Sequence, residues 1–444
     1  MRKLLLLAGF MLTVGMMKGQ VRTNVAELQK AQREVAAQEK ALRERIVQLS
    51  KEKGWPLAIT GKNGRIALLT DIDVLGYPVY VSTTNSLSAA TIRTNKLWPG
   101  GSTGLNLSGS SANMKSKLGL WDGGRARTSH VELTGRILQK DNPTSVSDHT
   151  THVAGTLMAS GVNPDAKGMA FGLQQLIVYD FNNHNSEMLN EASGLLVSNH
   201  SYSTIAGWYY NQDQGRWEFY GENGAFEDYK FGYYSNDAQM WDSIAYLSPN
   251  YLIVKAAGNN RSENGPQVGE TYWGYNASGQ MVNKGARPSG MSSNDSYDCI
   301  PTYGVAKNIL TVGAVNPILS GYARPQDVEM TSFSSWGPTD DGRIKPDVVA
   351  AGVDVFSSTS GSDNEYSFFS GTSMAAPAAA GSLLLLQEYY SQLHGGAVMR
   401  SATLKGIVIH TADEAGPSPG PDYMFGWGLI NMEKAAAVIS SNNT

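Results

Sequence analysis

The sequence Gly-Thr-Ser-Met-Ala-Ala-Pro at residues 371–377 decides how the rest of the chain is interpreted. Small and then aliphatic residues follow as far as Leu386, which predicts a loop turning into a buried helix with Ser373 in its first turn. The unpaired N–H groups of a helix start can hold negative charge that develops on a substrate, and Gly371 lets a substrate backbone approach closely. Pro377 falls about one turn into the helix, where a missing N–H costs little. Ser373 is therefore a candidate nucleophile, although an ordinary helix cap has the same local pattern.

The composition is that of a globular chain with mixed surface charge. Of 444 residues, 41% are hydrophobic and 17% charged, and the net charge is −4. Nothing in this balance favours a nucleic acid or an anionic membrane as a partner. The single cysteine, Cys299, excludes an internal disulfide framework and is expected to be a half-buried small residue.

The first residues have the pattern of a secretory signal. Residues 1–3 supply positive charge, and the apolar run at residues 4–17 is too short for a comfortable membrane span. We expect a signal peptide over residues 1–19 and export to the periplasm or the extracellular space. No second long apolar segment follows in the sequence, so we expect no stable membrane anchor.

The chain from Lys117 onward alternates strand-like and helix-like stretches. This alternation predicts a three-layer α/β domain over residues 117–444, with a mostly parallel central sheet covered on both faces. In such sheets functional residues lie at the carboxyl ends of the strands. The strand-like runs are 118–121, 176–179, 195–197, 252–254, 309–315 and 348–351, and the helical stretches are 149–160, 186–192 and 236–246.

Three polar motifs stand where such a sheet would place chemistry. Asp122 directly follows the first strand, His149 opens a helical stretch of small residues, and Asn259 follows a later strand. Each has an ordinary interpretation when taken alone, because aspartate and asparagine next to glycine commonly form turns. His149 and His152 stand three positions apart, but no Glu or Cys lies at ligand spacing, so we do not expect a zinc site.

The four motifs, in chain order, supply aspartate, histidine, asparagine and serine. The order Asp, His, Ser is that of subtilisin and differs from those of chymotrypsin and the α/β hydrolases. The chain resembles the subtilase family of subtilisin-like serine peptidases at all four places, over residues 117–437. The motifs are Trp-Asp-Gly-Gly at 121–124, His-Thr-Thr-His-Val-Ala-Gly-Thr at 149–156, Ala-Ala-Gly-Asn at 256–259 and Gly-Thr-Ser-Met-Ala-Ala-Pro at 371–377.

Two positions depart from the family pattern. The family usually has Ser or Thr after the aspartate and Gly after the histidine, where this chain has Gly123 and Thr150. Neither change removes a reacting group, but Thr150 puts a branched side chain where the motif has none. We expect the helix that begins near His149 to enter at a slightly different angle, which affects rate rather than identity.

The resemblance implies a serine endopeptidase that cleaves proteins or peptides through an acyl-enzyme. Ser373 would attack, His149 would take its proton, and Asp122 would orient the imidazole. The oxyanion would be held by the Asn259 side chain and the Ser373 backbone N–H. No cofactor is required for this chemistry. Subtilases commonly bind calcium, but no acidic pattern here identifies calcium ligands.

The resemblance also places substrate recognition in outline. Residues 198–203 resemble the family's substrate-aligning strand, which pairs with the peptide as an added β-strand. Small residues in the pocket for the side chain before the cut leave room for a medium or large apolar or aromatic side chain. The aromatic-rich insert at 208–234 would narrow or cover the cleft, or else simply pack at the surface. The two pocket walls are expected to be Ser201, Tyr202 and Ser203 on one side and Ala256, Ala257 and Gly258 on the other.

A long amphipathic helix is predicted at residues 24–53. This stretch lacks Gly and Pro, and apolar residues recur every seven positions at 28, 35, 42 and 49. Strand-like runs follow at 65–69 and 77–81. With an exported hydrolase downstream, we expect residues 20–84 to be a removable prosegment of a zymogen, acting as an intramolecular inhibitor or chaperone; simple packing of the helix is the alternative. Residues 85–116, rich in Ser, Thr, Asn and Gly, are expected to form an exposed joint.

Two further alternatives stay open. The chain would be a peptide-binding relative without activity if the helix served assembly and Ser373 failed to react with a fluorophosphonate. It would be an esterase if Ser102, in Gly-Gly-Ser-Thr-Gly at 100–104, sat on a nucleophile elbow. That elbow needs a buried strand before it and a helix after it, whereas Trp-Pro precedes and polar residues follow, so we expect a loop there.

Overall fold

The computed structural model describes residues 24–60, 66–83, 89–318 and 321–441, with a seven-stranded sheet at its centre. Every neighbouring pair in this sheet is parallel. Five of the six predicted buried runs are strands of it, and the sixth, 195–197, meets β7 only at Val197, where that strand begins. The short edge strand at 137–139 had no clear signal in the sequence. The strands in spatial order are β15 (Val348–Ala351), β14 (Leu310–Val315), β11 (Leu252–Ala256), β7 (Val197–His200), β4 (Leu118–Asp122), β6 (Leu176–Asp180) and β5 (Ile137–Gln139).

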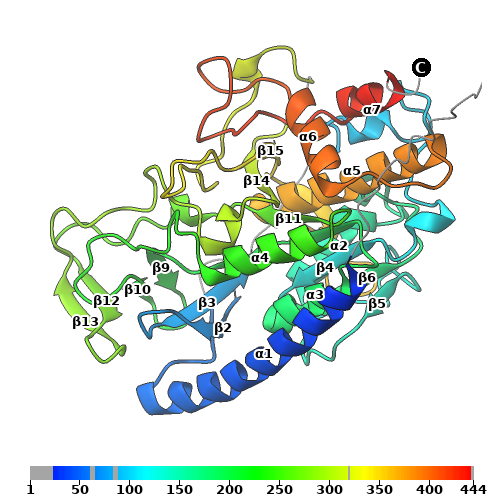
Figure 1. Ribbon diagram of the computed structural model, residues 1–444. Coiled ribbons are helices and arrows are strands. Elements are labelled where there is room, and N and C mark those ends of the chain that lie inside the picture. Colours follow the sequence, from blue (N-terminus) through cyan, green and yellow to red (C-terminus); the bar gives the residue numbers. More distant parts are fainter. Residues whose placement is uncertain (1–23, 61–65, 84–88, 319–320, 442–444) are drawn as a thin grey trace, which may run out of the picture.

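Helices cover both faces of the sheet (Figure 1). Alternate strand residues bury their side chains on opposite faces, so Leu120 packs in one core cluster and Trp121 in the other. The domain is therefore the expected three-layer α/β fold. One face is covered by α2 (Asp148–Met158) and α5 (Thr372–Leu393), with α6 (Ser401–Thr411) and α7 (Met432–Ser441) packed beside α5; the other face is covered by α3 (His184–Glu191) and α4 (Asn236–Leu247).

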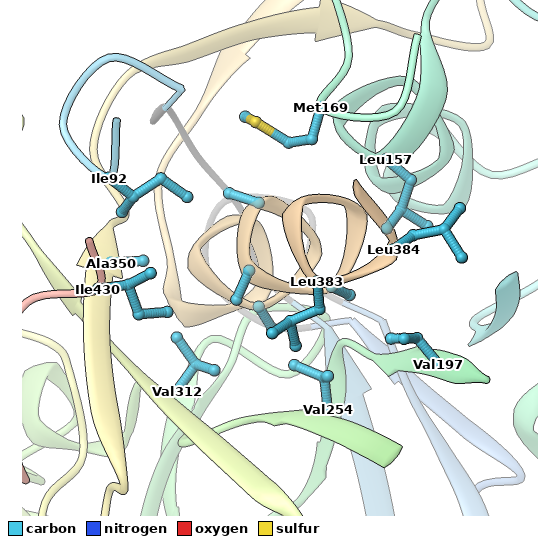
Figure 2. Close-up of a cluster of buried hydrophobic side chains, with 14 of the residues drawn as sticks. Ile92, Leu157, Met169, Val197, Val254, Val312, Ala350, Leu383, Leu384 and Ile430 are labelled. Atoms are coloured by element: carbon cyan, nitrogen blue, oxygen red, sulfur yellow. The ribbon is translucent and has the colours of Figure 1, made fainter. Parts of the chain in front are cut away.

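Helix α5 runs through the main core (Figure 2). Leu383 faces Val254 and Val312 of the sheet, and Leu384 faces Leu157 of α2. A helix that is apolar on all sides is buried on all sides, which is what the run after Ser373 predicts. Packing along the whole length of α5 thus fixes where its first turn lies.

The N-terminal segment, meaning the described residues 24–60 and 66–83, forms a helix and three strands. The helix matches the prediction: the Asn24 side chain accepts the Glu27 N–H at 3.2 Å, and Gly54 ends the helix in the left-handed region. Figure 1 shows it alongside α3. The predicted signal peptide at residues 1–19 lies outside the described residues. The elements are α1 (Val25–Lys53), β1 (Ala58–Thr60), β2 (Ile66–Ile72) and β3 (Pro78–Thr83).

Strand β3 leaves the N-terminal segment and joins the body of the protein. It pairs antiparallel with β8 (Tyr202–Thr204), which follows β7 almost directly. The resulting four-stranded sheet has the order β1-β2-β3-β8. The N-terminal segment is therefore linked by main-chain hydrogen bonds to the strand that was predicted to align substrate.

The predicted insert at 208–234 and a second insert at 261–296 come together as a second small sheet, which we call the inserted sheet. A hairpin from each insert contributes two strands, and the hairpins join through one parallel pair. The inserted sheet stands beside β2 and β3 in Figure 1. Its strands are β13 (Met281–Ala286), β12 (Thr271–Tyr275), β10 (Arg216–Phe219) and β9 (Trp208–Asn211) in spatial order; a separate hairpin of β16 (Val355–Ser358) and β17 (Tyr366–Phe369) packs on α2.

The segment 85–116 is not the exposed joint that its composition predicts, as far as it is described from residue 89 on. Ile92, Leu97, Leu107 and Met114 are buried in the main core cluster. The sequence does not indicate this burial, because the four apolar residues are separated by polar residues and follow neither a helical nor a strand period. None of the helices in the described ranges is both long and apolar enough to cross a membrane.

Candidate active site

Asp122 and His149 meet at the edge where β4 ends and α2 begins. Asp122 is fully buried, and its Oδ1 lies 2.5 Å from Nδ1 of His149, the second residue of α2. The same oxygen accepts the Gly123 N–H at 2.7 Å. Because a carboxylate can only accept, the imidazole donates from Nδ1 and its basic nitrogen is Nε2.

Thr150, one of the two departures from the family pattern, packs into this corner. Its hydroxyl lies 3.1 Å from the Gly123 carbonyl, 3.2 Å from the Gly124 carbonyl and 3.3 Å from Asp122 Oδ1. The side chain thereby ties the start of α2 to the loop that carries the aspartate. Ser147 caps the helix by accepting the Thr150 N–H at 3.2 Å. The sequence analysis noted only the branched side chain of Thr150 and did not predict these hydrogen bonds.

Ser373 is the second residue of α5, and only 2% of it is exposed. Its hydroxyl donates to the Ser201 carbonyl at 2.9 Å, and the Ser201 hydroxyl donates back to the Ser373 carbonyl at 2.7 Å. Helices α2 and α5 pack against each other, so His149 and Ser373 occupy equivalent places at the starts of two neighbouring helices. Ser373 is thus held against the end of β7, where substrate alignment was predicted.

Asn259 follows β11 and is oriented by the first turn of α5. Its Oδ1 accepts the Thr372 N–H at 2.8 Å, so the donor that the amide can offer a ligand is Nδ2. Thr372 Oγ1 accepts the Gly258 N–H at 3.1 Å, which joins the serine loop to the asparagine loop. Gly258 has φ +111°, and a Cβ there would lie 2.9 Å from Asn260 Oδ1 and 3.1 Å from Ser335 Oγ, so only glycine fits this turn.

A groove contains Ser373, Thr372 and Asn259 together with part of the two predicted walls. Ser201 and Ala257 do not line it: Ser201 is turned to Ser373, and the side chain of Ala257 is buried in the cluster beneath α3 and α4. Four of the six predicted wall residues line the groove, namely Tyr202, Ser203, Ala256 and Gly258.

Lys255 is a site residue that the sequence analysis missed. It is buried in β11, and its ammonium donates to the Tyr202 carbonyl and, at 2.7 Å, to the Ala256 carbonyl. Lys255 therefore connects the two predicted pocket walls, because Tyr202 belongs to one and Ala256 to the other. Burial lowers the pKa of Lys255 to about 7, while the Asp122 carboxylate opposes that shift. A lysine inside the apolar run Leu-Ile-Val-Lys-Ala-Ala was the available signal, because an unpaired buried lysine is costly.

His152 and Cys299 have structural surroundings. His152 Nε2 donates to the Val355 carbonyl at 3.1 Å, and burial lowers the pKa of His152 to about 3, so the ring is neutral near pH 7. Cys299 is fully buried rather than half-buried, and burial raises the pKa of its thiol to about 12. Within the described residues no three His, Cys, Asp or Glu side chains gather in a way that could hold a metal ion.

Ser102 lies in a run of turns, as predicted, with no strand before it or helix directly after it. Its hydroxyl donates to Glu433 Oε1 at 2.9 Å. The surroundings that a nucleophile elbow requires are missing at this serine.

The profile of the Subtilase family matches residues 103–428. The chain belongs to the subtilase family. The resemblance seen in the four motifs is thereby confirmed, and the chain carries a subtilase-family peptidase domain.

The chain matches known proteins either over a short stretch at higher identity or over a longer stretch at low identity. It is 42% identical over 85 residues to C5a peptidase of Streptococcus pyogenes, which covers 19% of this chain and 7% of that protein. It is 26% identical over 396 residues to the Serine protease/ABC transporter B family protein tagB of Dictyostelium discoideum, covering 71% of this chain and 20% of that protein. The chain thus spans a small part of these relatives. The Clostridium perfringens CspB protease has a similar fold, with a TM-score of 0.55 and 15% identity over 80% of this chain and 97% of that one.

Proposed function

We propose that this subtilase is an exported serine endopeptidase that works through Asp122, His149 and Ser373. The observation that carries the proposal is the 2.5 Å contact between Asp122 Oδ1 and His149 Nδ1, with Ser373 on the first turn of the adjoining buried helix. A serine hydroxyl is a poor nucleophile at neutral pH and needs a base that is itself held in one tautomer. The carboxylate supplies that constraint by accepting the Nδ1 proton.

The reaction follows from these positions. His149 Nε2 takes the Ser373 proton as the hydroxyl attacks the substrate carbonyl, and it returns that proton to the leaving amine. The acyl-enzyme is then hydrolysed by water through the same base. Negative charge on the tetrahedral oxygen is stabilised by Asn259 Nδ2 and the Ser373 N–H. Every proton transfer is handled by these side chains, so the proposed chemistry requires no cofactor, and structural calcium stays an expectation without assigned ligands.

We further propose that residues 20–84 act as a prosegment that blocks the site until it is removed. Supporting this, β3 pairs with β8 in the antiparallel manner by which an added peptide strand would bind there. A strand held in this place excludes a substrate from the same main-chain hydrogen bonds. The apolar run at residues 4–17 supports export, and peptide or protein substrates are the partners we propose.

Covalent labelling tests the catalytic proposal. A fluorophosphonate probe should label the self-processed wild-type protein at Ser373, and the Ser373→Ala variant should stay unlabelled. Equal labelling of both proteins would refute the catalytic proposal and favour a peptide-binding role. A label recovered on Ser102 would support the esterase alternative instead.

Sequencing the amino terminus of active protein tests the prosegment. We expect the mature chain to begin beyond Thr83, because β3 ends there. A fully active protein that still begins before Asn24 would refute removal of α1.

A further inference from the structure

The carboxylate of Asp122 has few hydrogen-bond donors for a buried charge. It is fully buried, and its Oδ1 receives the Gly123 N–H at 2.7 Å and contacts His149 Nδ1 at 2.5 Å. Among the described residues no group donates to its Oδ2. A buried charge is costly unless hydrogen bonds or opposite charges compensate it. Each further donor that reaches Asp122 therefore changes the charge that faces the imidazole.

The Thr150 hydroxyl is the third group that can donate to this carboxylate. Thr150 is fully buried directly after His149, and its Oγ1 lies 3.3 Å from Asp122 Oδ1. The carbonyls of Gly123 and Gly124 lie at 3.1 and 3.2 Å, so three acceptors compete for one proton. The carboxylate is the charged one of the three. Hydrogen bonds to an ionised acceptor are roughly twice as strong as those between neutral groups.

Both departures from the family pattern meet at this carboxylate. The family usually has a hydroxyl side chain after the aspartate, where this chain has Gly123, which offers only its N–H. The family usually has glycine after the histidine, where this chain has Thr150, which brings a hydroxyl to Asp122 Oδ1. One hydroxyl is thus lost at the end of β4 and one is gained at the start of α2.

We propose that Thr150 is a positioning residue for the Asp122–His149 pair, and that its hydroxyl replaces the one missing at position 123. The role rests on the proposed endopeptidase function and adds a residue to its machinery. By donating to Asp122 Oδ1, the hydroxyl keeps the carboxylate turned toward His149 and reduces the negative charge that acts on the imidazole. Thr150 is fully buried, so it acts through these two side chains and not on substrate.

Substitutions at position 150 test the hydroxyl. Thr150→Val keeps the branched shape and removes the donor, whereas Thr150→Ser keeps the donor. The readout is the second-order rate constant for fluorophosphonate labelling of Ser373 in self-processed protein, which needs His149 as base but no known substrate. Thr150→Val should lower this constant about 10-fold, the rate equivalent of one modest hydrogen bond, and Thr150→Ser should keep most of it.

The pH profile of labelling separates positioning from packing. Without the hydroxyl, more of the carboxylate's charge acts on the imidazole and stabilises its protonated form. His149 accepts the Ser373 proton only when it is neutral, so the acid limb of the profile should move to higher pH in Thr150→Val, by about half a pH unit. Thr150→Ser should keep the wild-type limb. Other titratable groups that interact with this pair are the same in all these proteins, namely Lys255, His152 and Tyr202.

Thr151, the next residue of α2, provides a matched control. It is also fully buried, and its hydroxyl donates to the Ser147 carbonyl at 2.7 Å and accepts the Arg127 N–H at 2.9 Å. It therefore ties the helix start to the loop after β4 through groups other than Asp122. Thr151→Val should lower the free energy of unfolding in urea about as much as Thr150→Val does, and it should leave the acid limb in place.

Moving the hydroxyl tests whether the two positions are equivalent. Thr150→Gly removes the hydroxyl, and Gly123→Ser added to that variant restores the arrangement that the family usually has. The double variant should be labelled several-fold faster than Thr150→Gly alone. Equal labelling rates would show that the Thr150 hydroxyl does not replace one at position 123.

The outcomes separate this inference from the proposed function. Labelling of Ser373 with the same rate and the same acid limb in wild type and Thr150→Val would overturn the positioning role and leave the endopeptidase in place. Equal shifts of the limb in Thr150→Val and Thr151→Val would also overturn it, because loosening of α2 would then be the cause. Absence of labelling in the wild-type protein would overturn the proposed function and this inference with it.

Discussion

In the proposed mechanism, Ser373 attacks the substrate and Asn259 stabilises the oxyanion. Asn259 uses its oxygen to accept the Thr372 N–H, which leaves its amide nitrogen as the donor toward substrate. A donor of this kind acts on charge that develops only in the transition state. Its removal should therefore affect the rate of turnover more than the binding of substrate.

We expect Asn259→Ala to lower kcat by about 100- to 1000-fold with a much smaller change in KM. Steady-state kinetics on a single fluorogenic peptide measures both constants. A variant whose loss lies entirely in KM would contradict the assignment, since it would make Asn259 a group that binds substrate in its ground state. Fluorophosphonate labelling of Ser373 in the same protein checks that the nucleophile is still in place.

Lys255 supports the two predicted pocket walls by donating to the Tyr202 and Ala256 carbonyls. Replacing it by Met leaves the Tyr202 and Ala256 carbonyls without this nitrogen donor, and a lost buried partner costs about 1 to 3 kcal/mol. We expect Lys255→Met to lower the free energy of unfolding by that amount in urea denaturation near pH 9.

The same variant carries a pH signature. Burial lowers the pKa of Lys255 in the folded protein to about 7, below its unfolded value, so the unfolded chain binds more protons between these two pKa values. The stability that Lys255 contributes therefore rises as pH increases from about 7 toward about 10. The difference in unfolding free energy between wild type and Lys255→Met should grow over that range. A constant difference would refute the shifted pKa.

At the scale of elements, the N-terminal segment contacts residues 117–444 at several places. Strand β3 adds to β8, and α1 packs against α3 and, less extensively, α4. Beside α1, two carboxyl groups line one small cavity, Asp71 of β2 and Asp237 in the first turn of α4. Like charges so placed cannot both ionise without cost.

Docking of the N-terminal segment should therefore weaken as pH rises. Burial and then Asp237 raise the pKa of Asp71 to about 7, with Asp73 adding to the rise and Arg45 opposing it. Since the folded pKa lies above the unfolded one, the docked state is favoured at acidic pH and loses stability as pH rises from about 4 through about 7. Hydrogen exchange of β2, measured at pH 5 and pH 8 in the Ser373→Ala chain, should show greater protection at pH 5.

The variant Asp71→Asn removes the ionisable group and should make β2 protection nearly independent of pH over this range. Glu34→Gln, an exposed carboxylate on α1, is the matched control and should keep the wild-type response. If Asp71→Asn and Glu34→Gln respond alike to pH, the Asp71–Asp237 pair is not the cause.

At the scale of the whole molecule, the parts that sequence reasoning found are those encoded in contiguous residues. Leu118–Trp121 and the other apolar runs predict strands because burial on both faces needs unbroken hydrophobic residues. Asp122 lies at the end of a strand and Ser373 in the first turn of a helix. Both places can be predicted from the residues next to them in the sequence. Neither the burial of Ile92 nor the edge strand at 137–139 is indicated by the residues next to them in the sequence.

The features that the sequence did not predict depend on contacts between distant segments. The inserted sheet is built from hairpins whose nearest strands, β10 and β12, are separated by more than fifty residues, so neither hairpin alone indicates the sheet. The pairing of β3 with β8 and the bridge made by Lys255 likewise depend on tertiary proximity. Propensity and period carry no information about such partners.

The inserted sheet and the N-terminal segment share one hydrophobic cluster. Ile46, Trp55 and Tyr80 of the segment pack with Tyr220 and Tyr275 of the body. Trp55 anchors this contact, because its indole N–H donates to the Gly279 carbonyl at 2.5 Å. Removing the segment would therefore expose the side chains of Tyr220 and Tyr275 that pack against it.

We expect Trp55→Ala to loosen the segment strongly, since removing a buried tryptophan costs about 3 to 5 kcal/mol. In the Ser373→Ala chain, which stays whole, an added protease should cleave the N-terminal segment much faster than in the chain without the Trp55 change. In the active protein the same substitution should shorten the delay before peptidase activity appears. Leu57→Ala is the control, because half of Leu57 (50%) is exposed, and it should change neither rate appreciably. Equal protease sensitivity of the Trp55 and Leu57 variants would mean that the shared cluster does not hold the segment and that the pairing of β3 with β8 and the packing of α1 on α3 do.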